Sequence, residues 1–336
     1  MGRGCIVVTG VARHSLGEAF VRALLGRATG HQVIGIDRVA NADLDNVAGL
    51  QQVLFDLNPL GGSADLTTFA TALENTIGDV VTTAGSRGVE DLVQCAGLYD
   101  FGTFLDHDVE RRKALLGLNV VGTTELLHAV MRLNHRLRRQ NHTEFTHMLV
   151  GSFQGLYARK RRPIYAPSKA YGIDLCTSLV EGREVAKCLY LAAGPLDTPM
   201  LHRNHWVKKA KGSEEFFQRI LDGPRERYRS IFVHCDQATL ENAAHDEFRA
   251  DVEALRIAMR KYRAQRKEAC AAELGVLSAE CCGSVLASIL VSAQSQSGVY
   301  MVRAGAEGTG VLVTMATFKS LDRGRVFKSA AKGVAL

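Results

Sequence analysis

A tyrosine, a lysine and a serine stand at spacings that suit acid–base chemistry. Tyr165 and Lys169 are four residues apart with Pro167 between them, and Ser152 lies thirteen residues before the tyrosine. On a helix, residues i and i+4 share a face, with Cβ atoms about 5–6 Å apart. Proline is tolerated in the first turn of a helix, where its missing N–H costs little. The pattern therefore predicts a helix that begins near Tyr165 and places the phenol beside the ammonium group.

A phenol beside an ammonium group can act as a general acid or base. Free tyrosine has a pKa of about 10 and is a poor base at neutral pH, but a nearby cation favours the phenolate. We therefore expect Lys169 to lower the pKa of Tyr165. Ser152 ends the apolar run HMLVGS, so its hydroxyl could hydrogen-bond the same substrate oxygen. Because this spacing also occurs by chance, the interpretation depends on the elements that position the three residues.

Short apolar runs alternate with amphipathic segments through about the first 200 residues. The runs are CIVVTG, QVIGID, QQVLFD, EDLVQCAG, HMLVGS and KCLYLAAGP, and a further one, GVYMVRAG, covers 298–305. Such alternation is typical of βαβ units and of a parallel sheet covered on both faces. We expect an α/β, doubly wound Rossmann fold, with a mostly parallel sheet in the order 3-2-1-4-5-6-7 flanked by helices. Ligands of such folds bind at the carboxyl ends of the strands.

The sequence after Met200 follows a different pattern. Residues 201–280 are charged, helical in character and without a convincing strand, so we expect a helical substrate-binding insertion before the last strand. The insertion and the rest of 1–336 are predicted to form a single Rossmann-type domain. An apolar stripe over 248–262 indicates a helix that packs either on its own domain or on a second protomer. The basic tail, 318–336, is expected at the surface.

Composition excludes several classes of protein. The chain is 46% hydrophobic and 23% charged, which is ordinary for a soluble globular protein. No apolar run approaches the roughly 20 residues that cross a bilayer, so no membrane partner is expected. The first strand starts at Cys5, which leaves no room for a leader and favours a cytoplasmic location. The net charge of +6 argues mildly for anionic ligands, and no nucleic-acid partner is expected.

Cysteine and histidine show no metal-binding pattern in the sequence. The eight cysteines form no C-x-x-C pair, and we expect buried, reduced thiols rather than a disulfide or zinc framework. The eleven histidines also lack metal-ligand spacing, so no metal site is predicted. His14 and His107 are expected to be surface residues.

The first strand ends in a turn that suits a pyrophosphate. In VTGVARHSLGEAF, Gly10 and Gly17 bracket the passage from strand to helix, where backbone N–H groups and the helix dipole can face a ligand. The second strand ends in Asp37, which is placed to accept hydrogen bonds from an adenosine ribose. Because a carboxylate would repel a 2′-phosphate, NAD is favoured over NADP, although Arg38 and Arg13 are placed to pair with such a phosphate.

Two more strand ends complete the predicted cofactor site. FDL places Asp56 and Leu57 beside the adenine, and CAG brings backbone close to the ligand. The predicted cofactor-binding residues of this part are Gly10, Arg13, His14, Ser15, Leu16, Asp37, Arg38, Asp56, Leu57, Cys95, Ala96 and Gly97.

In this order, the motifs resemble those of the short-chain dehydrogenase/reductase family, in its classical type. The likeness covers roughly 1–200 and the strand near 300, and rests on VTGVARHSLG, GID, FDL, CAG, LNVVG, GSFQG, YAPSK and GPLDTPM. The resemblance implies a catalytic tetrad of Asn119, Ser152, Tyr165 and Lys169, and cofactor contacts from Tyr165, Lys169, Pro195 and Thr198. It also implies a homodimer or homotetramer that pairs through helices matching roughly 106–136 and 164–182.

Three departures from the family's pattern stand out. The loop from Thr9 to Gly17 is one residue longer than usual, as in enoyl-acyl carrier protein reductases, and His14 and Ser15 stand near its middle glycine. The family's N-A-G is C-A-G here, and its P-G after the sixth strand appears as Gly194-Pro195.

The resemblance implies an NAD(P)-dependent oxidoreductase that interconverts a secondary alcohol and a ketone, with Tyr165 as general acid/base. An enoyl-reductase-like enzyme is one alternative, although those enzymes space their tyrosine and lysine more widely. A nucleotide-sugar epimerase or dehydratase is another, although that branch favours glycine where Arg13 stands. A non-catalytic NAD-binding regulator is the third, and loss of the tyrosine or lysine would have supported it.

Two basic clusters leave open whether the small-molecule substrate carries negative charge. Arg159, Lys160, Arg161 and Arg162 are consecutive, and Lys208, Lys209 and Lys211 lie in the insertion. The two clusters either converge on a phosphate or carboxylate of the substrate, or are solvated surface patches.

Overall fold

The computed structural model of the chain describes residues 4–27, 30–62, 65–138, 145–156, 161–193, 196–197, 277–292, 294–304 and 311–318. All of them belong to one compact unit, which comprises Met1–Met200 and Gly275–Leu336. The other compact unit, Leu201–Leu274, lies outside the described residues. The insertion expected over 201–280 is therefore described only in its last four residues, and the tail only at Phe318.

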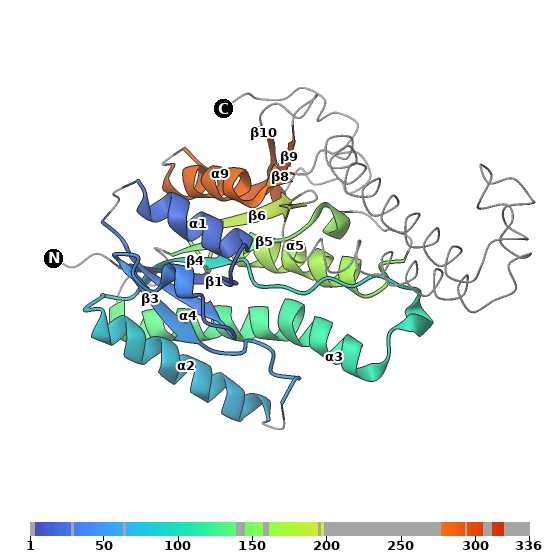
Figure 1. The fold of residues 1–336 in the computed structure, drawn as a ribbon, viewed down its shortest axis with the longest axis horizontal. Coiled ribbons are helices and arrows are strands. Elements are labelled where there is room, and N and C mark those ends of the chain that lie inside the picture. The colour runs from blue at the N-terminus through green and yellow to red at the C-terminus, as the bar shows by residue number, and fades with distance from the viewer. Residues whose placement is uncertain are drawn as a thin grey trace, which may run out of the picture. The chain divides into compact units, whose positions relative to one another are not determined.

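An eight-stranded sheet forms the centre of the described part (Figure 1). Its order is β10-β9-β6-β5-β4-β1-β2-β3, and every pair is parallel except β9 with β10. From β3 to β9 this is the predicted order, so the doubly wound Rossmann fold is confirmed. The strands are β1 (Cys5–Thr9), β2 (Gln32–Asp37), β3 (Leu50–Leu54), β4 (Val89–Gln94), β5 (Thr146–Val150), β6 (Lys187–Ala193), β9 (Gly298–Ala304) and β10 (Val311–Ala316).

The edge strand β10 is an addition to the predicted sheet. It pairs antiparallel with β9, with Val311 opposite Ala304 and Ala316 opposite Val299. The alternation of strand and helix that identifies the parallel strands does not extend to it, because only six residues lie between β9 and β10, too few for the crossover that a parallel strand needs. A separate pair, β7 (Leu196–Asp197) and β8 (Leu277–Ser278), joins the end of the sheet region to the start of α9.

Helices cover both faces of the sheet (Figure 1). One hydrophobic cluster packs α2, α4 and α5 against one face, and a second packs α1 and α9 against the other. Strand β1 shows why both faces are apolar, because Cys5 and Val7 belong to the first cluster, and Ile6 and Val8 to the second. The helices are α1 (Leu16–Leu25), α2 (Leu66–Thr83), α3 (Val109–Leu116), α4 (Thr123–Arg138), α5 (Tyr165–Glu181) and α9 (Ala279–Val291).

A π-helical turn, Gly117–Gly122, joins α3 to α4 into one long helix. Among the described residues, the stretch Val109–Leu137 is the one helix long and apolar enough to cross a membrane by length and composition. Half of its most apolar window is buried inside the protein, and core helices commonly pass the same test. The stretch is therefore weak evidence for a membrane.

Candidate active site

The carboxyl ends of β1 and β4 lie side by side at the point where the strand order reverses. Thr9 pairs with Gln94 at these ends, β2 continues the sheet on one side and β5 on the other. Such a switch point is where doubly wound folds bind their ligands. The loops that follow these strands therefore carry the candidate site.

The turn after β1 requires glycine at two positions. Gly10 has φ +74°, and a Cβ there would lie 2.7 Å from the backbone nitrogen of Ala96. A Cβ on Gly17 would collide with the carbonyl oxygen of Gly10. The turn thus packs backbone against backbone at the start of α1, and a helix N-terminus of this kind can bind an anionic group.

Three of the turn's amides are already bound inside the protein. The N–H of Ala12 donates to the Asp37 carboxylate at 2.9 Å, and that of His14 donates to the Glu18 carboxylate at 2.6 Å. The N–H of Ser15 donates to the carbonyl of Ala12 at 3.1 Å. The first two helical amides belong to Leu16 and Gly17 and, by their place in α1, have no acceptor within that helix. Of the loop residues predicted from the sequence, Leu16 is therefore better placed than His14 to offer its amide to a phosphate.

Ser15 and Glu18 fix the start of α1. Ser15 caps the helix, accepting from the N–H of Glu18 at 3.0 Å, and its hydroxyl donates to the carbonyl of Gly10 at 2.6 Å. Glu18 is almost fully buried and pairs with Arg22 at 2.9 Å. His14, at φ +59°, is exposed as expected.

Asp37 stands at the end of β2 and faces the turn. One carboxylate oxygen accepts from Ala12, and the other accepts from the N–H of Val39 at 3.2 Å. Each oxygen keeps a second lone pair for a ribose hydroxyl. Arg13, which could have neutralised this charge, instead pairs with Asp43 at 2.7 Å, and Arg38 is exposed.

The predicted cofactor contacts after β3 and β4 differ in how far they are buried. Asp56 is exposed and accepts from Asn58, whereas Leu57 is buried and its carbonyl lies against Gly122 of the π-helical turn. After β4, Cys95, Ala96 and Gly97 are half-buried. The amide of Ala96 donates to the Thr9 hydroxyl at 3.0 Å, which ties the two strand ends together.

Helix α5 begins at Tyr165, as the position of Pro167 predicts. The phenol of Tyr165 is buried and hydrogen-bonds the side chain of Ser152, which follows β5. One turn along the helix, the Lys169 Nζ lies 5.8 Å from the centre of the Tyr165 ring and donates to the carbonyl of Val150 at 3.4 Å. The structure therefore brings these three predicted residues together.

Asn119 lies in the π-helical turn and is buried beside Lys169. Its amide oxygen accepts from the N–H of Leu98 at 2.8 Å, and its NH₂ group donates to the carbonyl of Leu98 and to the hydroxyl of Ser168. A Cβ on Gly97 would lie 3.0 Å from the Lys169 nitrogen and 3.3 Å from the Asn119 oxygen. Glycine at 97 thus lets the loop after β4 close onto both side chains.

The pKa of Tyr165 differs in direction from the sequence-based expectation. Burial raises it to about 12, while the hydrogen bond from Ser152 and the charge of Arg162 oppose the rise. Lys169 is not among the groups that shift it, because burial lowers the pKa of the lysine itself, to about 8. In this state the phenol is held in its protonated form.

Tyr190 in β6 is a positioning residue that the sequence did not reveal. Its hydroxyl accepts from the N–H of Ser152 at 3.2 Å and donates to the carbonyl of Lys169 at 2.9 Å. A Cβ on Gly151 would collide with its ring, and one on Gly155 would come within 2.8 Å of its oxygen. Tyr190 therefore fixes the serine to the backbone of α5. The sequence contains these glycines and the tyrosine, but they are far apart along the chain, and only the folded structure shows that they are in contact.

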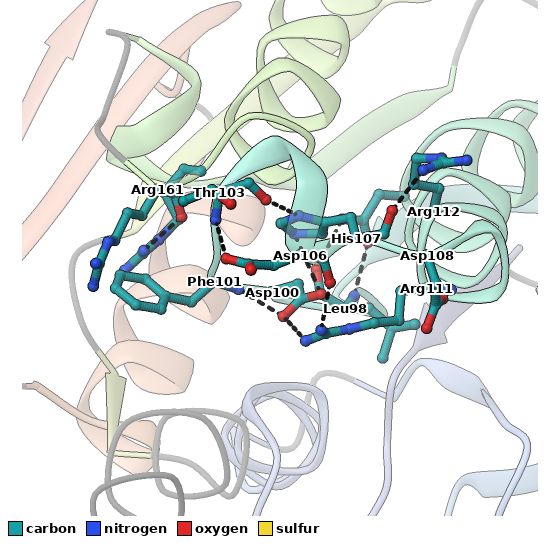
Figure 2. Close-up of polar contacts among 12 residues, drawn as sticks. Leu98, Asp100, Phe101, Thr103, Asp106, His107, Asp108, Arg111, Arg112 and Arg161 are labelled. Carbon is teal, nitrogen blue, oxygen red and sulfur yellow. Dashed lines mark hydrogen bonds and ion pairs between the residues drawn. The ribbon is translucent and has the colours of Figure 1, made fainter.

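Figure 2 shows the polar contacts that hold the loop after β4. Asp100 accepts from the Arg111 guanidinium at 2.7 Å, and His107 Nε2 lies 3.4 Å from the other carboxylate oxygen. The N–H of Gly102 donates to the carbonyl of Arg161 at 3.1 Å, which joins the loop to the segment before Tyr165. His107 is only 2% exposed, so the prediction that it lies at the surface is wrong. The loop folds over the imidazole ring, whose Nδ1 lies 2.7 Å from the carbonyl oxygen of Thr103.

The same loop forms an aromatic wall against Tyr165. The ring of Tyr99 meets that of Tyr165 edge to face, with centroids 4.8 Å apart. The guanidinium of Arg162 lies 4.8 Å from the centre of the Tyr99 ring and 4.2 Å from that of Phe101. One member of the predicted basic run is thus held close to the phenol.

The remaining predicted positions lie outside the described residues. They are Pro195, Thr198, Arg159, Lys160, Lys208, Lys209 and Lys211, together with the apolar stripe over 248–262.

Together, the switch point, the glycine turn and the strand-end acid define a Rossmann-type dinucleotide-binding protein. A sequence model described as short chain dehydrogenase matches residues 4–207. The chain therefore belongs to the short-chain dehydrogenase/reductase family, whose members are NAD(P)-dependent oxidoreductases that act on small molecules and are often oligomers.

Solved structures share this fold at low sequence identity. The KRED1-Pglu enzyme is 19% identical, covers 88% of this chain and 99% of its own, and has a TM-score of 0.55. A short chain dehydrogenase family protein from Francisella tularensis is 16% identical over 89% and 97%, with a TM-score of 0.54. A 3-oxoacyl-[acyl-carrier protein] reductase from Brucella melitensis in complex with NAD is 17% identical over 86% and 90%, with a TM-score of 0.53. No curated protein sequence matches the chain.

Proposed function

We propose that this protein is an NAD-dependent oxidoreductase that interconverts a secondary alcohol and a ketone, with Tyr165 as general acid and base. The contact between Tyr165 and Ser152 carries the proposal, because it joins a buried phenol to a hydroxyl at the end of the neighbouring strand. Lys169 lies one helical turn away, at the same edge of the sheet as the glycine turn. Such a pair can bind one substrate oxygen from two sides.

The residues present fit a nicotinamide dinucleotide. The Leu16 and Gly17 amides at the start of α1 would hold the pyrophosphate, and Asp37 would accept the adenosine ribose hydroxyls. Gly97 gives close access to Lys169, which would hold the second ribose. When bound, the nicotinamide ring supplies or accepts the hydride. NAD is favoured over NADP because Arg13 is paired with Asp43 and leaves the Asp37 charge in place.

The proton chemistry belongs to the protein's own side chains. In ketone reduction, Tyr165 donates its phenolic proton to the carbonyl oxygen, which becomes the alcohol oxygen, and in oxidation the phenolate takes the proton back. A pKa raised to about 12 keeps the phenol protonated at neutral pH, which is the form that reduction needs. The Ser152 hydroxyl donates to the negative charge that develops on the same oxygen. Asn119 holds the loop after β4 against α5 and so keeps Lys169 in place.

Replacing Tyr165 by phenylalanine tests the proposal. The change removes the proton donor and keeps the ring that packs on Tyr99. We expect turnover with NADH and a panel of ketones to fall by about 10²–10⁴-fold, while NADH binding, followed by its fluorescence, is retained. Tyr171→Phe is the matched control, because Tyr171 lies on the same helix and bonds Thr124. A Tyr165→Phe enzyme that keeps more than about a tenth of its activity would disprove the assignment.

A further inference from the structure

Three side chains with soft metal-ligating atoms meet in the core, away from the active site. His147 comes from β5, Cys176 from α5 and Cys188 from β6, and all three are fully buried. Their ligand atoms all lie within 4.8 Å of one another. They are far apart in the sequence, so no ligand spacing could reveal them.

A glutamine orients the histidine. The NH₂ group of Gln94 donates to the carbonyl of Thr123 at 2.9 Å, so its oxygen faces His147 Nε2, 3.2 Å away. Nε2 must then carry the hydrogen, which leaves a lone pair on Nδ1. That lone pair faces the Cys188 sulfur at 3.5 Å. Histidines that bind metals usually donate their other ring N–H to a carbonyl or carboxylate oxygen in this way.

The two thiols form a ligand pair. The sulfurs of Cys176 and Cys188 lie within 4.8 Å of each other, and Cys188 also contacts His147 Nδ1 at 3.5 Å. Zn–S bonds of about 2.3 Å and Zn–N bonds of about 2.0 Å place three ligand atoms about 3.5–4 Å apart, in keeping with this cluster.

We propose that His147, Cys176 and Cys188 form a structural site for a thiophilic d¹⁰ cation, Zn²⁺ or Cu⁺. Two sulfurs and an imidazole are ligand types that both ions bind, and Zn²⁺ in a structural site takes a fourth ligand besides these three. Two thiolates with Zn²⁺ are electrically neutral, which a buried site favours, while Cu⁺ is satisfied by three ligands. The ion would join β5, β6 and α5, the elements that lead to Ser152 and carry Tyr190 and Tyr165.

Metal analysis of the full-length protein tests the site. Protein is produced with added Zn²⁺ or Cu⁺, dialysed against a weak chelator and analysed for bound metal. We expect about one ion per chain and a higher Tm than that of the stripped protein. In stripped protein, Co²⁺ should give a sulfur-to-cobalt charge-transfer band. These readouts need no mutant, so a poorly folding variant does not weaken the test.

Substitutions locate the ion. Cys188→Ser and Cys176→Ser should each lower affinity at least about tenfold, and Gln94→Leu, which keeps all three ligands, should lower it about 10–100-fold. Cys5→Ser is the matched control, because Cys5 is equally buried and its sulfur donates to the carbonyl of Gly88, outside the cluster. Wild-type protein that stays below about a tenth of an equivalent with both metals would overturn the proposal. Equal metal in wild type and Cys188→Ser would overturn it too.

Discussion

At the scale of a single residue, we expect Asp37 to decide the choice between NAD and NADP. Two unit charges about 4 Å apart near a protein surface interact by roughly 4 kcal/mol, and about 1.4 kcal/mol is tenfold in affinity. We predict a higher kcat/KM with NADH than with NADPH. In Asp37→Asn, the ratio of the NADH value to the NADPH value should fall at least about tenfold. Asp79→Asn, which removes an exposed charge on α2, should leave the ratio unchanged. A wild-type preference for NADPH would show that Arg13 or Arg38 outweighs the carboxylate.

We expect the binding of the cofactor to depend on pH through the charge of Lys169. Burial lowers its pKa to about 8, so its charge is present below that pH and is lost as the pH rises through it. Because the charged amine is the stronger donor to a ribose hydroxyl, NADH affinity should fall above about pH 8. Lys169→Met, which is neutral throughout, should give a flat profile at weaker affinity. A wild-type profile without this break, or a break that persists in the variant, would contradict the prediction.

The sequence predicts which candidate catalytic side chains meet better than it predicts their environment. Tyr165, Lys169 and Ser152 meet as expected, because helical spacing and a strand end determine their positions. The raised pKa of Tyr165 could not be predicted, since it results from burial beside Tyr99. The contact of Tyr190 with Ser152 also depends on how β5 and β6 pair.

At the scale of elements, the buried strands were predictable because each is a continuous apolar run that ends at a ligand-binding edge. The runs are continuous because both faces of these strands are buried, as in β1. Strand β10 was missed because it adds to the edge antiparallel to β9, only six residues further along the chain. The His147 cluster was missed because its members share no segment of sequence.

The segment before and along α3 presents exposed apolar side chains. Phe104 is 60% exposed, Leu105 94%, Val109 52% and Leu116 37%. Apolar side chains grouped on one surface often mark a protein interface. They lie at the start of one of the two helices expected to pair protomers, so we propose a homo-oligomer that buries them.

A charged substitution on this surface tests the oligomer. We predict that Leu105→Glu converts the protein to monomers in sedimentation velocity at micromolar concentration, because it places a carboxylate in the interface. Leu66→Glu, at an exposed apolar position at the start of α2, should sediment like the wild type. A monomeric wild type, or a Leu105→Glu protein that sediments as the wild type does, would refute the predicted interface.

At the scale of the whole molecule, the net charge of +6 favours anionic substrates, and Arg162 brings positive charge beside Tyr165. We predict that Arg162→Ala raises KM about tenfold for carboxylate- or phosphate-bearing ketones relative to neutral ones, and that added salt shrinks the difference. Arg87→Ala, in the exposed turn before β4 at the opposite end of the strands, is the control. If the ratio of the KM for anionic ketones to the KM for neutral ketones stays unchanged in Arg162→Ala, the basic run is solvated surface and does not bind substrate.

The transfer of deuterium from NADH labelled at nicotinamide C4 tests the oxidoreductase assignment most directly. With a panel of ketones and α,β-unsaturated carbonyl compounds, the account predicts deuterium on the carbinol carbon of an alcohol product. The Tyr165→Phe enzyme should bind the labelled NADH and transfer almost none. Deuterium on the β-carbon of a saturated product would instead identify an enoyl reductase. Binding of NADH without transfer to any compound would contradict the proposed catalysis.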